Sequence, residues 1–432
     1  MGGAAMLAAM LFAAPAALAG TPAYAPLNQP GPPLTVPMPL LKASLYCEPS
    51  VAHAKVTPVL LNPATGVTPE ENYSWNWELG LPKLGIPWCA YTSPNDTLNN
   101  IETSGEYLVY AIRTMYTLAG RKIDVMGHSQ GGMSMRWPLR FWPDTRAMVK
   151  SVIGFSGSNH GTTMLTASQC AAIGCPPADW QQTYQSPFIE ALNSYAETFA
   201  GISYTEIWTH TDEVVDPNGS AATASAALHT GAGRITNVPT QQICPLDVYE
   251  HLTIGTIDPV AYAIAVNALT HAAPANLSEI PKSVCSEVVS PQINPANLNA
   301  GLEILEAAPG LTSVELGPIA TLATGAPVLY SEPPLACYVY ATCTGADAPR
   351  LLLRISPRVG AGGHAVRAYV LVREGSALDP VPDVTVTLGG ARAVTSNAGI
   401  ATLYPILRAG QHPTVRARRQ GCDPASARVT VG

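Results

Sequence analysis

The stretch Lys122-Ile123-Asp124-Val125-Met126-Gly127-His128-Ser129-Gln130-Gly131 decides the fold class of this 432-residue chain. Its first five residues read as a buried β-strand, and a helical pattern begins at Gln130. Between them lies a Gly-x-Ser-x-Gly motif, in which the turn is so sharp that a Cβ on either glycine would clash with the backbone. Alone, this string predicts only a turn. With a strand before it and a helix after it, the motif predicts that Ser129 is a nucleophile presented at a strand end.

Strands and helices alternate on both sides of this motif. Further strands are predicted at residues 56–61, 149–155, 203–209 and 234–243, and a helix at 101–118. The alternation predicts an α/β fold with a mostly parallel central sheet that helices cover on both faces. The Ala- and Leu-rich residues 258–316 are expected to form a helical cap over the carboxyl edge of that sheet.

The composition changes near residues 345–349. Beyond them, short strand patterns alternate with Gly, Pro and Asn turns, which predicts a small all-β sandwich with strands at 368–372, 384–388 and 427–431. We therefore expect four parts: a signal peptide (1–19), a Pro-rich N-terminal arm that wraps the body (20–40), an α/β domain (41–347) and an immunoglobulin-like β-sandwich domain (350–432).

Charge is distributed unevenly between these parts. The net charge is −7, but residues 350–432 hold 11 arginines against four acidic residues, a balance of +7 that leaves −14 for the rest. Arg416, Arg418 and Arg419 lie close together near a predicted turn. Because guanidinium groups pair well with phosphate and carboxylate, we expect an anionic surface or polymer as a partner of this part. The alternative is that these arginines only solvate strand faces. We expect no nucleic-acid partner and a monomeric protein.

The N-terminus and the cysteines indicate the compartment. Residues 1–19 contain no charged side chain and end in Ala17-Leu18-Ala19, which is typical of a secretory signal. We therefore expect a secreted, extracellular protein, with no later apolar run long and clean enough to cross a bilayer. Nine cysteines fit an exported chain with disulfides and leave one thiol over. None has zinc-binding spacing, so we expect no metal and no cofactor.

A serine nucleophile needs a general base, and the base needs an orienting carboxylate. In this fold class the three residues follow in the chain order Ser, Asp, His. Asp212 is the leading carboxylate because it comes just after the predicted strand at 203–209. Asp216 is its nearest rival, and Asp247 lies too close to the candidate histidines.

Three downstream histidines compete for the role of base. His251 is the leading candidate because it follows the last predicted strand in a loop. His229 reads as a surface residue. His271 falls inside an apolar helical run, where a satisfied core histidine is expected.

These residues converge on a known family. Over residues 41–347 the chain resembles Candida antarctica lipase B and its relatives. The resemblance is carried by Leu60-Leu61-Asn62-Pro63-Ala64-Thr65-Gly66, Trp77, Ser129-Gln130-Gly131-Gly132, Trp180-Gln181-Gln182, Thr211-Asp212-Glu213-Val214-Val215 and His251 between Cys244 and Cys285. It implies an α/β-hydrolase fold, a lipase or esterase activity on apolar esters, and a Ser129-Asp212-His251 triad.

The resemblance also implies an oxyanion hole and a substrate pocket. The oxyanion would be met by backbone N–H groups of Thr65 and Gln130 and by the Thr65 hydroxyl. Several pocket positions depart from the family: His128 stands for a Trp, Val67 for a Thr, Asn72 for a Ser, Ser158 for an Asp and Ala64 for a Gly. We read His128 as a pocket-wall residue rather than a second base. The remaining expected pocket residues are Gln182, Val214 and Val215.

Two disulfides are implied by the same resemblance, Cys47–Cys89 and Cys244–Cys285. Cys170 and Cys175 have no counterpart in the family and could close a tight local loop where the family keeps a short mobile helix. Cys337, Cys343 and Cys422 stay unassigned.

The leading hypothesis is thus a secreted carboxylic-ester hydrolase with an apolar, tryptophan-bearing site. One alternative is a surface-binding or adhesion protein whose hydrolase body is vestigial, motivated by the basic C-terminal part. Another is a polyester or amide hydrolase with the same triad, because the scissile carbonyl would meet the same groups in each case.

Overall fold

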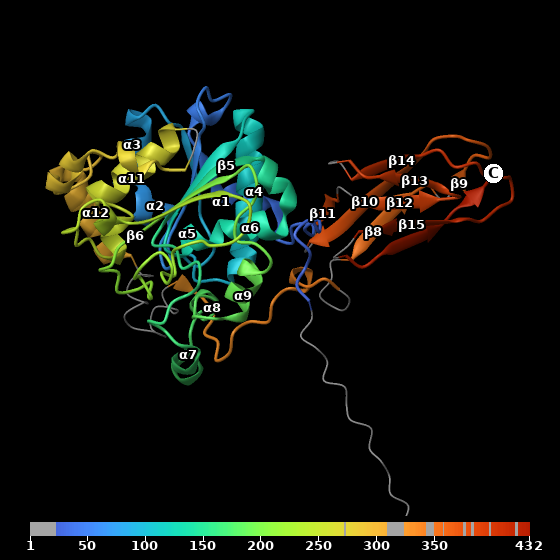
Figure 1. Cartoon of the computed structure of the whole chain (residues 1–432). Coiled ribbons are helices and arrows are strands. Elements are labelled where there is room, and N and C mark those ends of the chain that lie inside the picture. The colour runs from blue at the N-terminus through green and yellow to red at the C-terminus, as the bar shows by residue number, and fades with distance from the viewer. Residues whose placement is uncertain are drawn as a thin grey trace, which may run out of the picture.

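The computed structural model describes residues 23–271, 274–308, 324–342, 350–356, 358–374, 377–381, 384–396, 399–419 and 422–432. The expected signal peptide, residues 1–19, lies outside the described residues. Figure 1 shows an α/β part in blue to yellow and a set of strands in orange to red from the C-terminal residues.

A seven-stranded sheet forms the centre of the α/β part, with the strand order β1-β3-β2-β4-β5-β6-β7. Only β1 runs antiparallel to its neighbour. The strands are β1 (Leu45–Cys47), β2 (Val59–Asn62), β3 (Trp88–Tyr91), β4 (Ile123–His128), β5 (Val149–Phe155), β6 (Ser203–Trp208) and β7 (Arg234–Pro239). The mostly parallel α/β sheet expected from the sequence is confirmed.

Several strand bounds differ from the prediction. Strands β1 and β3 are only three and four residues long and were missed. The strand expected at 56–61 begins at Val59, and the strand expected at 234–243 ends at Pro239, where a 3₁₀ turn follows.

Both faces of the sheet are covered by helices (Figure 1). These are α1 (Met38–Ser44), α2 (Pro69–Tyr73), α3 (Trp77–Lys83), α4 (Ile101–Ala119), α5 (Gln130–Ser134), α6 (Arg136–Phe141), α7 (Ala167–Ile173), α8 (Pro177–Gln181), α9 (Pro187–Asn193), α10 (His251–Ile254), α11 (Pro259–Thr270) and α12 (Pro295–Ala307). Successive side chains of β4 point to opposite faces of the sheet, so each face packs against its own layer of helices. Val125 packs with α4 on one face, and Met126 packs with α3 and α11 on the other. The central strands β2, β3, β4 and β6 are buried along their whole length, as expected for a parallel sheet that helices cover on both faces.

Helix α11 does not form the expected cap. Val260, Ile264 and Ala268 pack against Ile153 and Ile207, so the helix covers a face of the sheet rather than its carboxyl edge. By length and composition, the stretch His251–Thr270 would also pass as a membrane span, contrary to our expectation. However, 67% of its most apolar window is buried inside the protein, which is what a core helix requires.

The N-terminal arm contacts the body at several points. The Ala25 N–H donates to the Val339 carbonyl (2.8 Å), and the Trp142 indole donates to the Pro32 carbonyl (2.9 Å). The buried Glu106 carboxylate accepts hydrogen bonds from the Thr35 hydroxyl and the Val36 N–H. The arm therefore satisfies polar groups that would otherwise be buried without partners.

The C-terminal residues form separate, mainly antiparallel sheets with a core of their own. One sheet has the order β11-β10-β14 with β8 also on β10, the second has the order β13-β12-β15-β16, and β17 pairs with β9. The strands are β8 (Leu351–Ile355), β9 (Arg358–Val359), β10 (Val366–Glu374), β11 (Ala377–Pro380), β12 (Thr385–Leu388), β13 (Ala391–Val394), β14 (Ile400–Leu403), β15 (Thr414–Arg418), β16 (Ala425–Arg428) and β17 (Thr430–Val431). The predicted all-β architecture is thus present, although the strand expected at 427–431 is divided at Val429.

The structure contains the disulfides Cys47–Cys89, Cys170–Cys175 and Cys244–Cys285. Cys337 is also disulfide-bonded, whereas Cys343 lies outside the described residues. Cys422 is a free, buried thiol in the C-terminal core, and burial raises its pKa to about 11. A thiol held protonated in this way is a poor nucleophile, so Cys422 acts as a core side chain.

Candidate active site

The candidate site lies at the carboxyl edge of the central sheet, where the parallel strands all end on the same side. Ser129 follows β4, Asp212 follows β6, and His251 follows β7 at the start of α10. The three residues are far apart in the chain, and the sheet topology brings them to one place.

Ser129 occupies a strained turn. Its φ of 55° is unfavourable for a residue with a side chain, and it is maintained by the packing of β4 against α5. A Cβ on Gly127 would overlap the carbonyl group of Gly131, and a Cβ on Gly131 would overlap the backbone of Asn62. Both glycines are therefore required for the close approach of strand and helix. The structure shows the local geometry that the sequence motif predicts.

The three candidate side chains form a continuous hydrogen-bonded chain. Ser129 Oγ lies 2.9 Å from His251 Nε2, and His251 Nδ1 lies 2.9 Å from Asp212 Oδ2. The other carboxylate oxygen of Asp212 accepts from the N–H groups of Val214 (2.9 Å) and Val215 (2.7 Å). These two bonds fix the carboxylate, which in turn orients the imidazole.

The electrostatic surroundings of the three side chains raise the pKa of the His251 imidazole. Burial lowers the pKa of His251, but the Asp212 charge and hydrogen bond, with Glu213 and Glu250 nearby, outweigh it, and the pKa lies above its ordinary value. Burial raises the pKa of Asp212, yet the His251 charge and the hydrogen bonds to this carboxylate bring it below its ordinary value. Asp212 is therefore ionised at neutral pH.

The other candidates for the carboxylate and for the base do not take part in the hydrogen-bonded chain at Ser129. Asp216 accepts a hydrogen bond from the Thr163 hydroxyl, and Asp247 packs against Asp258. His229 is exposed, as expected from the sequence. The expectation of a buried His271 is wrong: α11 ends one residue before it, and its exposed ring lies 3.0 Å from a carboxylate oxygen of Glu279.

A second network of amide and hydroxyl side chains lies near Ser129, and Thr65, Ser158 and Gln182 of this network line the same cavity. Gln182 Nε2 donates to Thr65 Oγ1 (3.0 Å), and Ser158 Oγ donates to Gln182 Oε1 (2.8 Å). Gln130 is held by the bond from its Nε2 to the Thr97 carbonyl (2.9 Å). Thr65 Oγ1 accepts from Gln182 and donates only a long hydrogen bond of 3.5 Å to Gln130 Oε1, which a substrate oxygen could replace as acceptor.

His128 is almost fully buried next to His251. Its ring lies 5.2 Å from the His251 ring, centre to centre. Burial, followed by the nearby His251, lowers the pKa of His128 to about 3. The ring is therefore neutral at the pH of catalysis, which agrees with a wall residue rather than a second base.

A cavity of about 570 Å³ opens at Ser129. Its lining includes all of the expected pocket residues, namely Val67, Asn72, His128, Ser158, Gln182, Val214 and Val215. It also includes residues that the sequence analysis did not assign to the pocket, among them Thr162, Met164, Leu165, Asp179, Glu213, Glu250, Leu252 and Leu305. Leu305 comes from α12, so this helix contributes the part of the wall expected from a cap.

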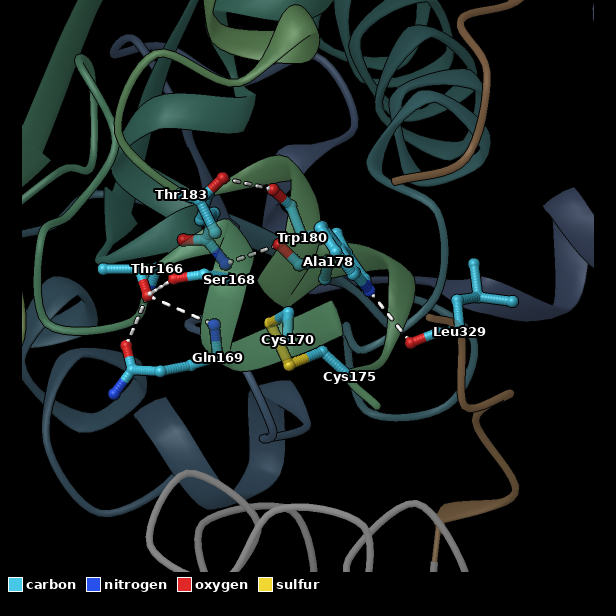
Figure 2. Close-up of a disulfide and its surroundings, with 10 residues drawn as sticks. Thr166, Ser168, Gln169, Cys170, Cys175, Ala178, Trp180, Thr183 and Leu329 are labelled. Carbon is cyan, nitrogen blue, oxygen red and sulfur yellow. Dashed lines mark hydrogen bonds between the residues drawn. A yellow bond between two sulfur atoms is a disulfide. The ribbon is translucent and has the colours of Figure 1, made fainter. Parts of the chain in front are cut away.

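None of the tryptophans, all of which fall in the described part of the chain, lines this cavity, contrary to our expectation. Trp77 packs against Phe155 and Tyr262 in the core. Trp180 packs beside the Cys170–Cys175 disulfide, and its indole donates to the Leu329 carbonyl (3.0 Å), as Figure 2 shows.

That disulfide ties α7 to the segment before α8 (Figure 2), in the stretch of chain between the cavity-lining residues Leu165 and Asp179. Cys175 also exchanges two backbone hydrogen bonds of 2.8 Å with Leu329. Met164 and Leu165, just before α7, line the cavity. We call the Cys170–Cys175 disulfide with its Leu329 contact the rim clip.

Comparison with known proteins agrees with this geometry. A family model described as lipase (class 2) matches residues 104–252, a range that contains Ser129, Asp212 and His251. Lipase B of Pseudozyma antarctica is 28% identical over 291 residues, which cover 66% of this chain and 83% of that protein. The crystal structure of Aspergillus fumigatus lipase B superposes with a TM-score of 0.62 at 28% identity, covering 74% of this chain and 77% of the other. The chain is similar to these lipase B proteins.

The class 2 lipase match and the similarity to lipase B together support an α/β-hydrolase fold and a carboxylic-ester hydrolase. The class 2 lipase match ends one residue beyond His251 and therefore excludes the C-terminal strands. Those strands are an addition to the part of the lipase B fold that carries the candidate site.

Proposed function

We propose that this protein is a secreted carboxylic-ester hydrolase that cleaves apolar esters through an acyl-enzyme, with Ser129 as nucleophile, His251 as base and Asp212 as orienting carboxylate. The observation that carries the proposal is the pair of 2.9 Å contacts that link the three side chains at the mouth of a mostly apolar cavity.

In the first half of the reaction, Ser129 Oγ attacks the ester carbonyl while its proton passes to His251 Nε2. Asp212 holds the Nδ1 proton and stabilises the imidazolium that forms. The developing oxyanion is met by the N–H groups of Gln130 and Thr65 and by the Thr65 hydroxyl, and the loss of one such donor costs about 10²–10³ in kcat.

Collapse of this intermediate breaks the bond to the alcohol, which leaves with the proton from His251. A water molecule then attacks the acyl-enzyme and gives its proton to His251. The second tetrahedral intermediate releases the free acid and returns the proton to Ser129. No cofactor is needed for any step, because proton transfer and oxyanion stabilisation come from the chain.

The same groups would also act on a polyester or an amide, so the choice of an apolar monomeric ester rests on the cavity. A volume of about 570 Å³ accommodates an extended acyl chain and its alcohol within one site. The proposal that the hydrolase body is vestigial is disfavoured by the complete hydrogen-bonded chain at Ser129.

We further propose that residues 350–432 are an immunoglobulin-like domain, residues 41–347 the hydrolase domain, and residues 1–19 a signal peptide. The C-terminal strands have a hydrophobic core made only of their own residues, which supports a separate unit. We propose that this unit binds a surface while the hydrolase acts as a monomer. The disulfides support export, since they persist in oxidising compartments.

The test compares the parent protein with Ser129→Ala on p-nitrophenyl esters of increasing chain length. Loss of the nucleophile is expected to lower kcat by about 10⁶, the size of the effect when a serine protease loses its triad serine. An unchanged melting temperature of the variant serves as the folding control. Activity within tenfold of the parent would overturn the mechanism.

A further inference from the structure

We propose that one face of the C-terminal unit binds an anionic lipid surface. This arginine face is the outer side of the sheet β13-β12-β15-β16, with Arg392, Arg416, Arg418 and Arg428 as its charged groups. The inference rests on the proposed role of the C-terminal unit as a binding module, and it specifies the residues and the partner.

Strand register places the four arginines on one side of the sheet. In β15 the residues alternate between buried and exposed, with Val415 and Ala417 in the core and Arg416 and Arg418 exposed. Since residues paired across strands lie on the same side, the partners of β15 extend this face. Arg416 pairs with Thr387, Thr387 pairs with Arg392, and Thr414 pairs with Arg428.

The charges on this face are of one sign. The other outward residues by the same register are Thr385, Thr387, Thr414, Ser426 and Val394. Within the described residues no ion pair holds any of the four arginines, and Arg392 makes only a long hydrogen bond of 3.4 Å to Thr385. Neighbouring strands lie about 4.8 Å apart and alternate residues about 6.7 Å apart, so the guanidinium groups form a compact array.

Exposed apolar side chains lie near the ends of the strands of this sheet. Tyr404 and Ile406 are 67% and 85% exposed, in the segment that follows β14. Pro405 and Leu407 of this segment pack so closely on Gly389, in the turn between β12 and β13, that a Cβ there would touch both. Val394, the last residue of β13, is 54% exposed. Exposed apolar side chains therefore accompany the arginines, with Val394 on the arginine face itself and the Tyr404–Ile406 segment next to the turn between β12 and β13.

This combination favours a lipid surface over a soluble polyanion. A soluble anionic polymer would engage only the charges and would leave Tyr404 and Ile406 in water. At a membrane interface, aromatic and aliphatic side chains enter the headgroup region while basic residues contact anionic lipids. Such docking would hold the hydrolase at the lipid–water boundary, where apolar esters collect.

The test uses the full-length protein and vesicles of equal parts phosphatidylglycerol and phosphatidylcholine, with co-sedimentation as the readout. The face variant carries Arg392→Ser, Arg416→Ser, Arg418→Ser and Arg428→Ser. The control removes the same charge from other exposed arginines by Arg350→Ser, Arg354→Ser, Arg358→Ser and Arg367→Ser. We expect the face variant to lose affinity by about 600-fold, because each of the four basic residues near an anionic surface contributes about fivefold, and the control to lose much less.

A second pair of measurements addresses the partner. Tyr404→Ser with Ile406→Ser is expected to weaken vesicle binding severalfold without changing binding to heparin, a soluble polyanion. Salt near 1 M is expected to abolish most binding of the parent, since screening then acts within about 3 Å.

The inference is overturned if the face variant and the control bind vesicles equally, or if the parent binds heparin but not vesicles. Hydrolysis of p-nitrophenyl acetate by every variant reports on the hydrolase separately. Lost binding with intact hydrolysis supports the arginine face, whereas a parent that binds vesicles but does not hydrolyse the ester contradicts only the proposed catalytic function.

Discussion

The Nε2 atom of His128 lies 2.8 Å from the backbone carbonyl oxygen of His251. A carbonyl only accepts, so Nε2 carries the proton, and Nδ1 faces the Asn72 side-chain amide at 3.5 Å. The residue before the nucleophile thus fixes the backbone of the proposed base.

From this contact we predict that His128→Leu lowers kcat/KM about tenfold. The variant leaves the His251 carbonyl buried without a donor, which typically costs about 1–3 kcal/mol. His128→Gln, which can still donate, is the matched control and should retain most of the activity. Initial rates on a short-chain ester together with melting temperatures provide the measurement. Equal rates for the two variants would contradict a positioning role for this hydrogen bond.

The pH dependence should follow His251. Only neutral imidazole accepts the Ser129 proton, and the pKa of His251 lies above its ordinary value because of Asp212. We therefore expect kcat/KM to rise with pH along a limb centred above about 6.5, the unperturbed histidine value. Asp212→Asn should lower activity by about 10⁴ through loss of the correct tautomer. A flat profile from acid to alkaline pH in the parent would rule out His251 as the base.

Asp179 should make substrate binding depend on pH. Its carboxylate faces the cavity, no hydrogen bond from the described residues reaches it, and burial raises its pKa to about 7. Above that pH a charge lies next to the bound acyl chain, so KM for a long apolar ester is expected to rise severalfold between pH 6 and 9.

Asp179→Asn keeps the shape of the cavity and should hold KM constant over the same range. Glu213 and Glu250, the other carboxylates in the cavity lining, are unchanged in this variant and provide the internal control. Parallel KM profiles for parent and variant would show that the acyl chain does not reach Asp179.

Asp258 should make the folded protein less stable at alkaline pH. Burial and the nearby Asp247 raise the pKa of Asp258 to about 8. Between the unfolded value near 4 and this value, the folded state holds a proton that the unfolded chain has lost, so stability falls as pH rises.

Asp258→Asn retains the cap at the start of α11, since Asn also accepts from the N–H groups of Val260 and Ala261. We expect its melting temperature to exceed that of the parent by several degrees at pH 9 and to match it at pH 4. Asp144→Asn, at an exposed pair with Arg113, is the control and should show no such gain. If the melting temperatures of the parent and Asp258→Asn differ by the same amount at both pH values, the protonation of Asp258 is not the cause of the stability change.

Sequence reasoning located the parts of the site that depend on strand ends. Ser129, Asp212 and His251 each follow a strand of a parallel sheet, and the order of these strands is constrained by chain topology. The residues that line the cavity were harder to predict from the sequence. Asp179 and Leu305 come from helices whose position depends on packing, and neither residue type nor spacing indicates which helix faces the cavity.

Helix α11 shows a related limit. Its apolar composition predicted a helix correctly, but periodicity does not tell whether a helix covers a sheet face or a sheet edge. His271 was misplaced for a local reason, because the helix ends at Thr270 and the next residue turns outward to Glu279. Helix ends are the positions that sequence patterns define least well.

The rim clip has a consequence for how the enzyme is produced. Cys170 and Cys175 are 0% and 3% exposed, so a reductant in the surrounding medium has little access to their bond once the chain has folded. The redox state of the rim is therefore decided during folding, in the compartment where the chain matures. Two preparations of identical sequence, one from an oxidising and one from a reducing compartment, would share the same triad but differ in whether the Cys170–Cys175 disulfide is formed. They would hydrolyse the smallest esters alike and diverge as the acyl chain grows longer.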